Sequence, residues 1–180
     1  VLGALTLASH AAASTHVLFR SADRGRTWIR SDAGLPGAAR INALAASPHR
    51  HFAGTDAGLF VSEDSGTTWR AGTAIPGPSQ RVLDLCVLGR TLFAGTDGGG
   101  IVRSDDDGAS WVRVDEERAS GRVRSLKPAG SGLFAGLDSG GVLRSSNGGR
   151  NWVSLAEGMP AGAQVFALTE LGGTVFAGLY

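Results

Sequence analysis

The chain has 180 residues, 42% of them apolar, which is enough for one ordinary domain with a sizeable core. Its 17 basic and 16 acidic residues nearly cancel, which argues against a surface that binds nucleic acid or an anionic membrane through overall charge. No run of 18 apolar residues is present, so no membrane span is predicted, and the single cysteine, Cys86, excludes an intrachain disulfide.

The first repeat is predicted at residues 1–40. Residues 1–13 are apolar and resemble the end of a secretion signal, but they lack a basic segment and a Met. Residues 11–15, Ala-Ala-Ala-Ser-Thr, align with a strand of the later repeats. We therefore expect residues 1–13 to form the first two strands of a degenerate repeat. An eight-residue phrase, Ser-Ala-Asp-Arg-Gly-Arg-Thr-Trp, follows at residues 21–28.

Three further repeats are predicted at residues 41–81, 82–122 and 123–164, with half a repeat at 165–180. Each begins with an apolar strand, at Ile41, Val82, Val123 and Val165, and reaches a Phe-Ala-Gly strand 11 residues later, at Phe52, Phe93, Phe134 and Phe176. In the complete repeats a third strand runs into the eight-residue phrase. The phrases end in Trp28, Trp69, Trp111 and Trp152, which are spaced 41, 42 and 41 residues apart.

These repeats predict an all-β chain. Glycine accounts for 28 of the 180 residues, well above the average share of about 7%. The glycines fall at fixed places between short apolar runs, which is typical of strands joined by tight turns. A four-stranded unit of this length cannot bury both of its faces alone, so neighbouring units must stack. Four-stranded antiparallel units repeated radially are the blades of a β-propeller. We expect residues 1–180 to form a single propeller, or part of one, with about four and a half blades.

The phrase Ser-x-Asp-x-Gly-x-Thr-Trp resembles the Asp-box, also called the bacterial neuraminidase repeat, in all four complete repeats. Families that share it include sialidases, xyloglucan-cleaving glycosidases, sortilin-type receptors and photosystem II assembly factors of the propeller kind. The resemblance implies a propeller fold, and it favours a secreted or periplasmic protein.

The residues of the phrase are expected to hold hairpins together rather than to touch a ligand. A carboxylate in a turn accepts backbone N–H bonds, glycine supplies a positive φ, the hydroxyl ties the two strands, and tryptophan fills space beside the neighbouring blade. The expected structural positions are Ser21, Asp23, Gly25, Thr27, Trp28, Ser62, Asp64, Gly66, Thr68, Trp69, Ser104, Asp106, Gly108, Ser110, Trp111, Ser145, Asn147, Gly149, Asn151 and Trp152.

A calcium loop at Asp105-Asp106-Asp107-Gly108 is rejected, because the next ligand positions of such a loop are Ala109 and Trp111. No metal site and no cofactor are predicted.

Two repeated positions are candidate ligand contacts at the end of the blades opposite the phrases. One precedes each innermost strand and holds Arg40, Arg81, Arg122 and Gln164. The other follows each second strand and holds Asp56, Asp97 and Asp138. Converging guanidinium groups suit a carboxylate, sulfate or phosphate, and sialidases, by resemblance, use an arginine cluster for a substrate carboxylate. Alternatively, the aspartates cap their own loops, or the arginines pair with loop carboxylates or with this set of aspartates.

No catalytic residue is predicted. Sialidases need a tyrosine nucleophile, and the only tyrosine is Tyr180; glycosidases need two carboxylates at a defined separation, and nothing in the sequence pairs any two. Enzymes of this fold usually carry long insertions between blades, whereas the repeats here have only 41 or 42 residues. This favours a binding or assembly module whose partner is a protein or a glycan. A glycosidase, or a purely structural part of a larger propeller, remains the alternative. Four and a half repeats leave open edges, so we expect part of a larger propeller, with association between copies as the second possibility.

Overall fold

The computed structural model describes residues 17–115, 119, 121–130 and 132–180. The two strands expected within residues 1–13 lie outside the described residues. Every regular element of the described chain is a β-strand, so no helix in this part is suited to crossing a membrane.

The strands form five antiparallel sheets. The first is the pair β1 (Phe19–Arg20) and β2 (Ile29–Arg30). The second contains β3 (Ile41–Ala46), β4 (His51–Thr55), β5 (Gly58–Ser62) and β6 (Arg70–Ala71). The third contains β7 (Val82–Leu88), β8 (Thr91–Thr96), β9 (Ile101–Ser104) and β10 (Val112–Arg113). The fourth contains β11 (Val123–Ala129), β12 (Gly132–Leu137), β13 (Val142–Ser145) and β14 (Val153–Leu155), and the fifth is the pair β15 (Val165–Leu171) and β16 (Thr174–Leu179).

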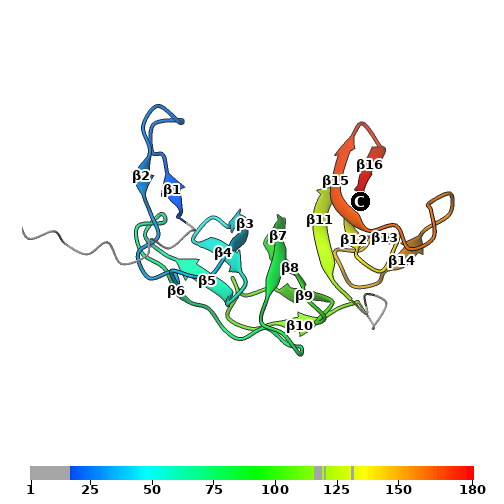
Figure 1. Cartoon of the computed structure of the whole chain (residues 1–180), viewed down its shortest axis with the longest axis horizontal. Coiled ribbons are helices and arrows are strands. Elements are labelled where there is room, and N and C mark those ends of the chain that lie inside the picture. Colours follow the sequence, from blue (N-terminus) through cyan, green and yellow to red (C-terminus); the bar gives the residue numbers. More distant parts are fainter. Residues whose placement is uncertain (1–16, 116–118, 120, 131) are drawn as a thin grey trace, which may run out of the picture.

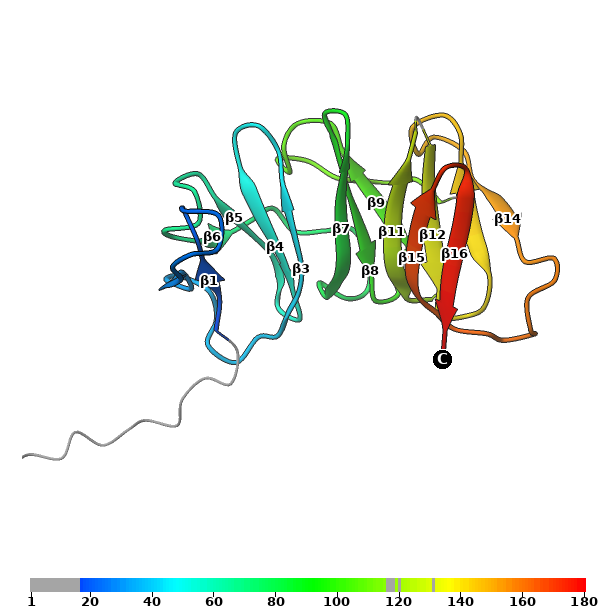
Figure 2. The same cartoon turned by 90° about the horizontal axis from the view of Figure 1, so that it is seen from above.

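The sheets stand side by side in an open arc (Figures 1 and 2). The first strand of each unit, β3, β7, β11 or β15, lies on the concave side, and the short fourth strands β6, β10 and β14 lie on the outside (Figure 1). The neighbouring inner strands contact one another. The prediction of an all-β chain built from four-stranded antiparallel units is confirmed.

The Phe-Ala-Gly strands explain how tightly the sheets stack. Phe52 and Phe93 are completely buried and belong to two separate core clusters between sheets. In β4, β8 and β12 the glycine of this strand lies against the inner strand of the next sheet. A side-chain carbon at Gly95 would come within 2.6 Å of the carbonyl oxygen of Val123, so only glycine allows this approach.

Each inner strand carries an irregularity near its start. The pairing register shifts between Ile41 and Ala43, and the same shift recurs in β7, β11 and β15. A bulge of this kind bends the strand and redirects the side chain at the extra residue. The second residue of each inner strand is therefore placed differently from a regular strand residue.

The eight-residue phrases form hairpins between the third and fourth strands, and we call these segments (21–28, 62–69, 104–111 and 145–152) the box hairpins. In the second, the Ser62 hydroxyl donates to Asp64 (2.8 Å) and accepts from the Gly66 N–H (2.8 Å). The Asp64 carboxylate also accepts from the N–H (2.9 Å) and the hydroxyl (2.6 Å) of Thr68. The first and third hairpins repeat this network.

The fourth box hairpin keeps a reduced network. The side-chain oxygen of Asn147 still accepts from the Ser145 hydroxyl (3.0 Å) and from the Asn151 N–H (2.9 Å). The threonine or serine hydroxyl that contacts the carboxylate in the other three hairpins is absent here, because Asn151 stands in its place. Since Asn147 is uncharged, the hydrogen bonds that it accepts are not charge-assisted.

The box tryptophans are not equivalent. Trp69 and Trp152 are 7% and 4% exposed, as expected for side chains that fill space beside a neighbouring blade. The indole N–H of Trp69 donates to the backbone oxygen of Ser31 in the preceding sheet (2.7 Å). For Trp28 the expectation is wrong: it is 61% exposed, because no described sheet precedes its own.

Candidate functional site

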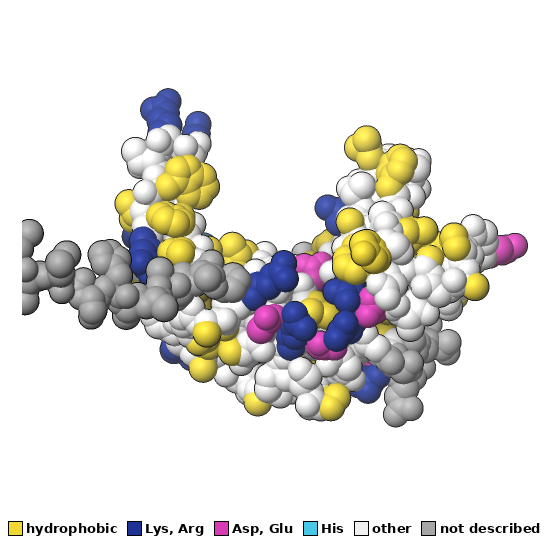
Figure 3. Space-filling view, viewed as in Figure 1, with side chains coloured by type: hydrophobic (Ala, Val, Ile, Leu, Met, Phe, Trp, Pro, Cys, Tyr) yellow, Lys and Arg dark blue, Asp and Glu magenta, His cyan; other side chains and the backbone are white. Residues whose placement is uncertain are grey.

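The repeated arginine and aspartate positions lie at one end of the sheets, and the box hairpins lie at the other. Strands one and two of each unit run in opposite directions, so the start of one and the end of the other meet. Backbone bonds fix this junction in successive units, where the N–H of Asp56, Asp97 or Asp138 donates to the carbonyl of Arg40, Arg81 or Arg122. Figure 3 shows basic and acidic side chains gathered at the centre of this face.

The side chains pair mainly across the boundary between sheets. The Arg81 guanidinium, just before β7, contacts Asp56 at the end of β4 in the preceding sheet (2.8 Å), and Arg122, just before β11, contacts Asp97 at the end of β8 (2.8 Å). Longer contacts run to the aspartate of the arginine's own sheet, from Arg81 to Asp97 (3.4 Å) and from Arg122 to Asp138 (3.7 Å). We call this continuous row the Arg–Asp ladder. It shows that the predicted arginines and aspartates pair with each other.

Two further residues belong to the ladder, and the sequence reasoning missed both. Arg124 contacts Asp138 (2.7 Å), and the Asn42 amide donates to Asp56 (2.8 Å) and to the Val82 carbonyl (2.8 Å). Both are the second residue of an inner strand, where the register shifts. Their polar character at this repeated position, otherwise Leu83 and Phe166, is the signal that an alignment of the repeats contains.

Arg40 and Gln164, at the two ends of the predicted set, do not join the ladder. Arg40 is exposed and has no ion pair within 4.0 Å among the described residues, although its charge helps to lower the Asp56 pKa. Among the described residues, the hydrogen bond of Gln164 is made by its backbone oxygen, which accepts from the Tyr180 N–H.

The ladder ends in aromatic side chains. The Arg124 guanidinium lies 4.4 Å from the centre of the Phe166 ring, a cation–π arrangement. Phe166 in turn packs against Tyr180, with the ring centres 5.7 Å apart. Phe166 is 42% exposed and Tyr180 95% exposed, so this end of the ladder presents a charged group and two open rings to solvent.

The neighbouring groups favour the charged form of Asp56 in the ladder. The Asn42 amide, followed by Arg81 and Arg40, lowers the pKa of Asp56. Asp97, above all, raises the pKa of Arg122. The arginine side chains remain partly open, 34% exposed for Arg81 and 44% for Arg122. Ion pairs this well solvated contribute little to stability, so a competing anion displaces them at small cost.

A second carboxylate on the inner strands has the opposite character. Asp84 on β7 accepts the N–H of Leu126 on β11 (2.7 Å) and that of Leu85 (2.8 Å), and so joins two sheets. Burial raises the pKa of Asp84. Because both of its oxygens are occupied by backbone donors, we interpret Asp84 as a structural link.

Nothing in the described chain gathers three or more His, Cys, Asp or Glu side chains that would hold a metal ion. The Asp105–Asp107 run, considered for calcium, is divided between different contacts. Asp105 pairs with Arg103 (2.8 Å), while Asp106 belongs to the box hairpin network.

No family model matches the sequence, and no curated protein matches it. Solved structures do. YCF48 bound to D1 peptide matches with a TM-score of 0.70 at 18% identity, over 91% of this chain and 56% of that chain. A GH74 xyloglucanase from Xanthomonas campestris matches with 0.62 at 17% identity, over 89% and 30%. The extracellular domain of BT4673 from B. thetaiotaomicron matches with 0.66 at 14% identity, over 84% and 21%.

The fold is that of a β-propeller. The three matched structures are propellers, and the radial sheets of this chain superpose on them. The chain spans 56% of the YCF48 chain and less of the other two. At these identities the likeness establishes the fold alone.

Proposed function

We propose that this chain is a non-catalytic Asp-box propeller that acts as a binding or assembly module. The observation that carries the proposal is the Arg–Asp ladder, a row of partly exposed arginines across the face where the units meet. The networks of the first three box hairpins, built from the same residue types, support the Asp-box assignment and a structural role for those residues.

The proposed ligand is a protein segment that carries a carboxylate. Such a group takes over guanidinium contacts that the ladder aspartates now make, through charge-assisted and bidentate bonds. Arg124, Phe166 and Tyr180 add a surface suited to an aromatic or apolar side chain beside the carboxylate. An acidic glycan uses the same guanidinium groups, so it is the second ligand class of the proposal.

Asp56 of the ladder is a poor candidate for the acid of glycoside hydrolysis. A general acid needs a raised pKa, whereas the pKa of Asp56 is lowered by its partners. Asp84, whose pKa is raised, is occupied by two backbone N–H groups. This contrast favours binding over turnover.

The test is binding of two fluorescent probes, the D1 peptide found with YCF48 and a heparin oligosaccharide. We expect at least one to bind, and Arg122→Gln to raise its Kd about tenfold or more, because a hydrogen bond to a charged group is lost. The matched control is Arg70→Gln, an exposed arginine of β6 that pairs with Glu63 outside the ladder. Failure of both probes to bind, or an equal loss in the two variants, would overturn the proposal.

We also propose that the open edges of the two terminal sheets pair between copies of the chain. Unpaired N–H and C=O groups on a sheet edge are a template for another strand. In the described chain β1–β2 and β15–β16 are two-stranded, whereas the three sheets between them have four strands.

A further inference from the structure

The complete sheets dock on one another through their box hairpins. A side-chain carbon at Gly108 would lie 3.3 Å from the Phe52 ring of the preceding sheet, and one at Gly149 would overlap the Phe93 ring. Arginines of the preceding sheet also donate to hairpin carbonyls, from Arg50 to Asp107 (3.1 Å) and from Arg103 to Gly148 (3.3 Å). The glycine turn therefore covers the phenylalanine, which becomes fully buried.

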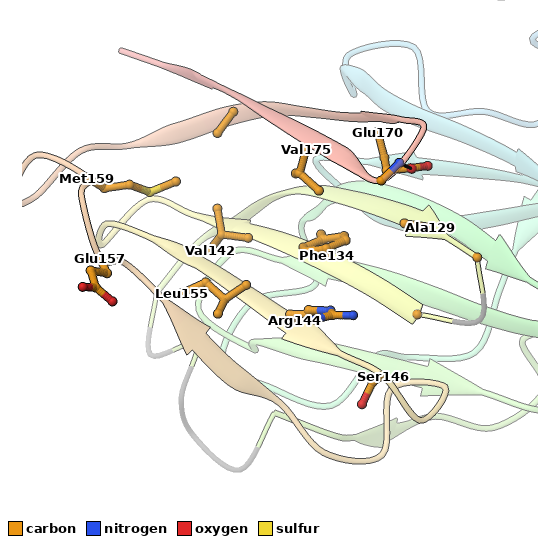
Figure 4. Close-up of a pocket in the computed structure, with 14 residues that line it drawn as sticks. Ala129, Phe134, Val142, Arg144, Ser146, Leu155, Glu157, Met159, Glu170 and Val175 are labelled. Carbon is orange, nitrogen blue, oxygen red and sulfur yellow. Dashed lines mark hydrogen bonds between the residues drawn. The ribbon is translucent and has the colours of Figure 1, made fainter.

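The last four-stranded sheet carries the same receiving groups without a described hairpin on them. Phe134 pairs in register with Arg144, as Phe93 does with Arg103. The Arg144 guanidinium lies over the Phe134 ring, 5.8 Å from its centre. The two strands β15 and β16 leave a cavity of about 800 Å³ over this face, lined by Phe134, Val142, Arg144 and Leu155 (Figure 4).

The first described sheet presents the complementary part. Its box hairpin is fully formed, with the Ser21 hydroxyl bonded to Asp23 (2.7 Å) and the Asp23 carboxylate bonded to the Thr27 hydroxyl (2.6 Å). No described sheet precedes it, and its apolar side chains are open. Trp28 is 61% exposed, and Phe19 is 51% exposed.

The strands at the two ends are complementary as well. β15 and β16 are the first two strands of a unit, and β1 and β2 correspond to the last two, since both pairs align with the complete repeats. In the complete sheets the phenylalanine of strand two lies opposite Val61, Arg103 or Arg144. This register places Phe176 opposite Arg20 and Ala177 opposite Phe19.

The alignment of the repeats offers residues 11–15 as another sequence for the second strand of this unit, but it is the poorer match. They have Ala11 where the complete repeats and β16 have phenylalanine. The phenylalanine supplies the buried ring at the two interfaces between four-stranded sheets, as Phe52 and Phe93 do, so β16 is the better second strand for this unit.

We propose that a second copy of the chain supplies its β1–β2 hairpin to the β15–β16 edge, giving a composite sheet in the order β15-β16-β1-β2. The inference rests on the proposed edge pairing and adds which edges meet, in which register and on which surface. Gly25 then covers Phe134, the turn carbonyls accept from Arg144, and Trp28 packs against Leu155. The two ends of one chain stand apart across the mouth of the arc, so two copies satisfy each other (Figure 1).

Two such composite sheets, one at each contact between the two copies, close a ring. Three complete sheets from each copy and two composite sheets make eight blades, which lies within the range of about four to eight found in propellers. The proposed assembly has a two-fold axis and pairs the terminal edges of the described sheets.

The test combines solution mass with cross-linking between variants that each carry one added cysteine. We expect the chain to have the mass of a dimer, and a mixture of Phe19→Cys and Ala177→Cys chains to form a mixed disulfide under a mild oxidant. Cys86 does not compete, because burial raises the pKa of its thiol to about 12. A Phe19→Cys chain mixed with Leu171→Cys, an exposed residue of β15 away from this register, serves as the control.

Each other outcome decides a different part. A self-cross-link of Ala177→Cys alone retains edge pairing and overturns the composite register. If the chain is a monomer and its Phe19→Cys/Ala177→Cys double variant forms the disulfide within one chain, the proposal that a second copy supplies the hairpin is overturned. A monomer without either cross-link overturns both edge pairing and the composite sheet, and leaves ligand binding by the ladder untouched.

A side-chain variant tests the docking surface separately. Trp28→Ala removes a side chain that is exposed in the single chain, so it is expected to raise the dimer Kd at least about tenfold without unfolding the protein. Val112→Ala, which shortens a 63%-exposed residue of β10, is expected to leave the dimer Kd unchanged. Equal dimer Kd values for the two variants would overturn the docking surface.

Discussion

The contact between a box hairpin and the preceding sheet is directly testable at two adjacent glycines. Gly148 and Gly149 both have a positive φ, 68° and 77°. An alanine side chain at Gly148 would meet nothing within 4 Å, whereas one at Gly149 would overlap the buried Phe93 ring. The two substitutions therefore share a backbone cost and differ in one packing contact.

The magnitudes follow from these surroundings. Placing alanine at a positive φ costs about 1 kcal/mol in either position. Overpacking against Phe93 adds about 1–3 kcal/mol at Gly149 alone, because the ring is fully buried and has little room to move. Gly149→Ala should therefore be less stable than Gly148→Ala by that amount.

The assay is urea unfolding of the wild type and both variants, with the slope m compared as well as the midpoint. Equal free energies of unfolding in the two variants would refute the docking of Gly149 on Phe93. Because the composite sheet places Gly25 on Phe134 in the same way, that result would also count against the composite sheet.

Three other outcomes are expected. Phe93→Ala should lower the free energy of unfolding by about 3–5 kcal/mol, whereas Leu171→Ala, at a 78%-exposed side chain, should stay within about 0.5 kcal/mol in the same urea assay. The Ser110 hydroxyl, above all, lowers the pKa of Asp106 to about 2, below the model-peptide value of 3.8. This carboxylate therefore stabilises the fold above about pH 4 and stops doing so as the pH falls toward 2. The Ser110 amide NMR signal should titrate near pH 2, while that of Asn151, bound to the uncharged Asn147, should not. Cys86, 8% exposed and with a thiol pKa of about 12, should react with a disulfide reagent only in denaturant, and rapid labelling of the native chain would contradict this.

Sequence reasoning found the strands because the repeat encodes them locally. The Phe-Ala-Gly strand needs a ring for the core and a glycine where the next inner strand passes, as at Gly95 beside Val123. Both demands arise inside every unit, so they recur every 41 or 42 residues. The prediction of four-stranded antiparallel units followed from that recurrence.

The same reasoning left the partners of the site residues open, because those partners come from the neighbouring sheet. Arg81 and Arg122 each contact the aspartate at the end of the second strand of the preceding sheet, at a sequence separation of 25 residues. Whether an arginine meets that carboxylate or a ligand depends on side-chain direction, which a repeat alignment does not contain. Asn42 and Arg124 were missed for a related reason, since the register shift that turns them toward the ladder is visible only in the folded strands.

The pairing across sheets also explains why the two ends of the ladder differ from its middle. Each ion pair needs an arginine and the aspartate of the preceding sheet, so the row stops where one of them is missing. At Gln164 the arginine is missing, and the adjoining inner strand carries Phe166 instead of a polar residue. Arg124 thus has one carboxylate partner, Asp138, and an open ring beside it. In the described chain this is where charge and apolar surface meet, and we expect it to set which carboxylate-bearing partner the ladder prefers.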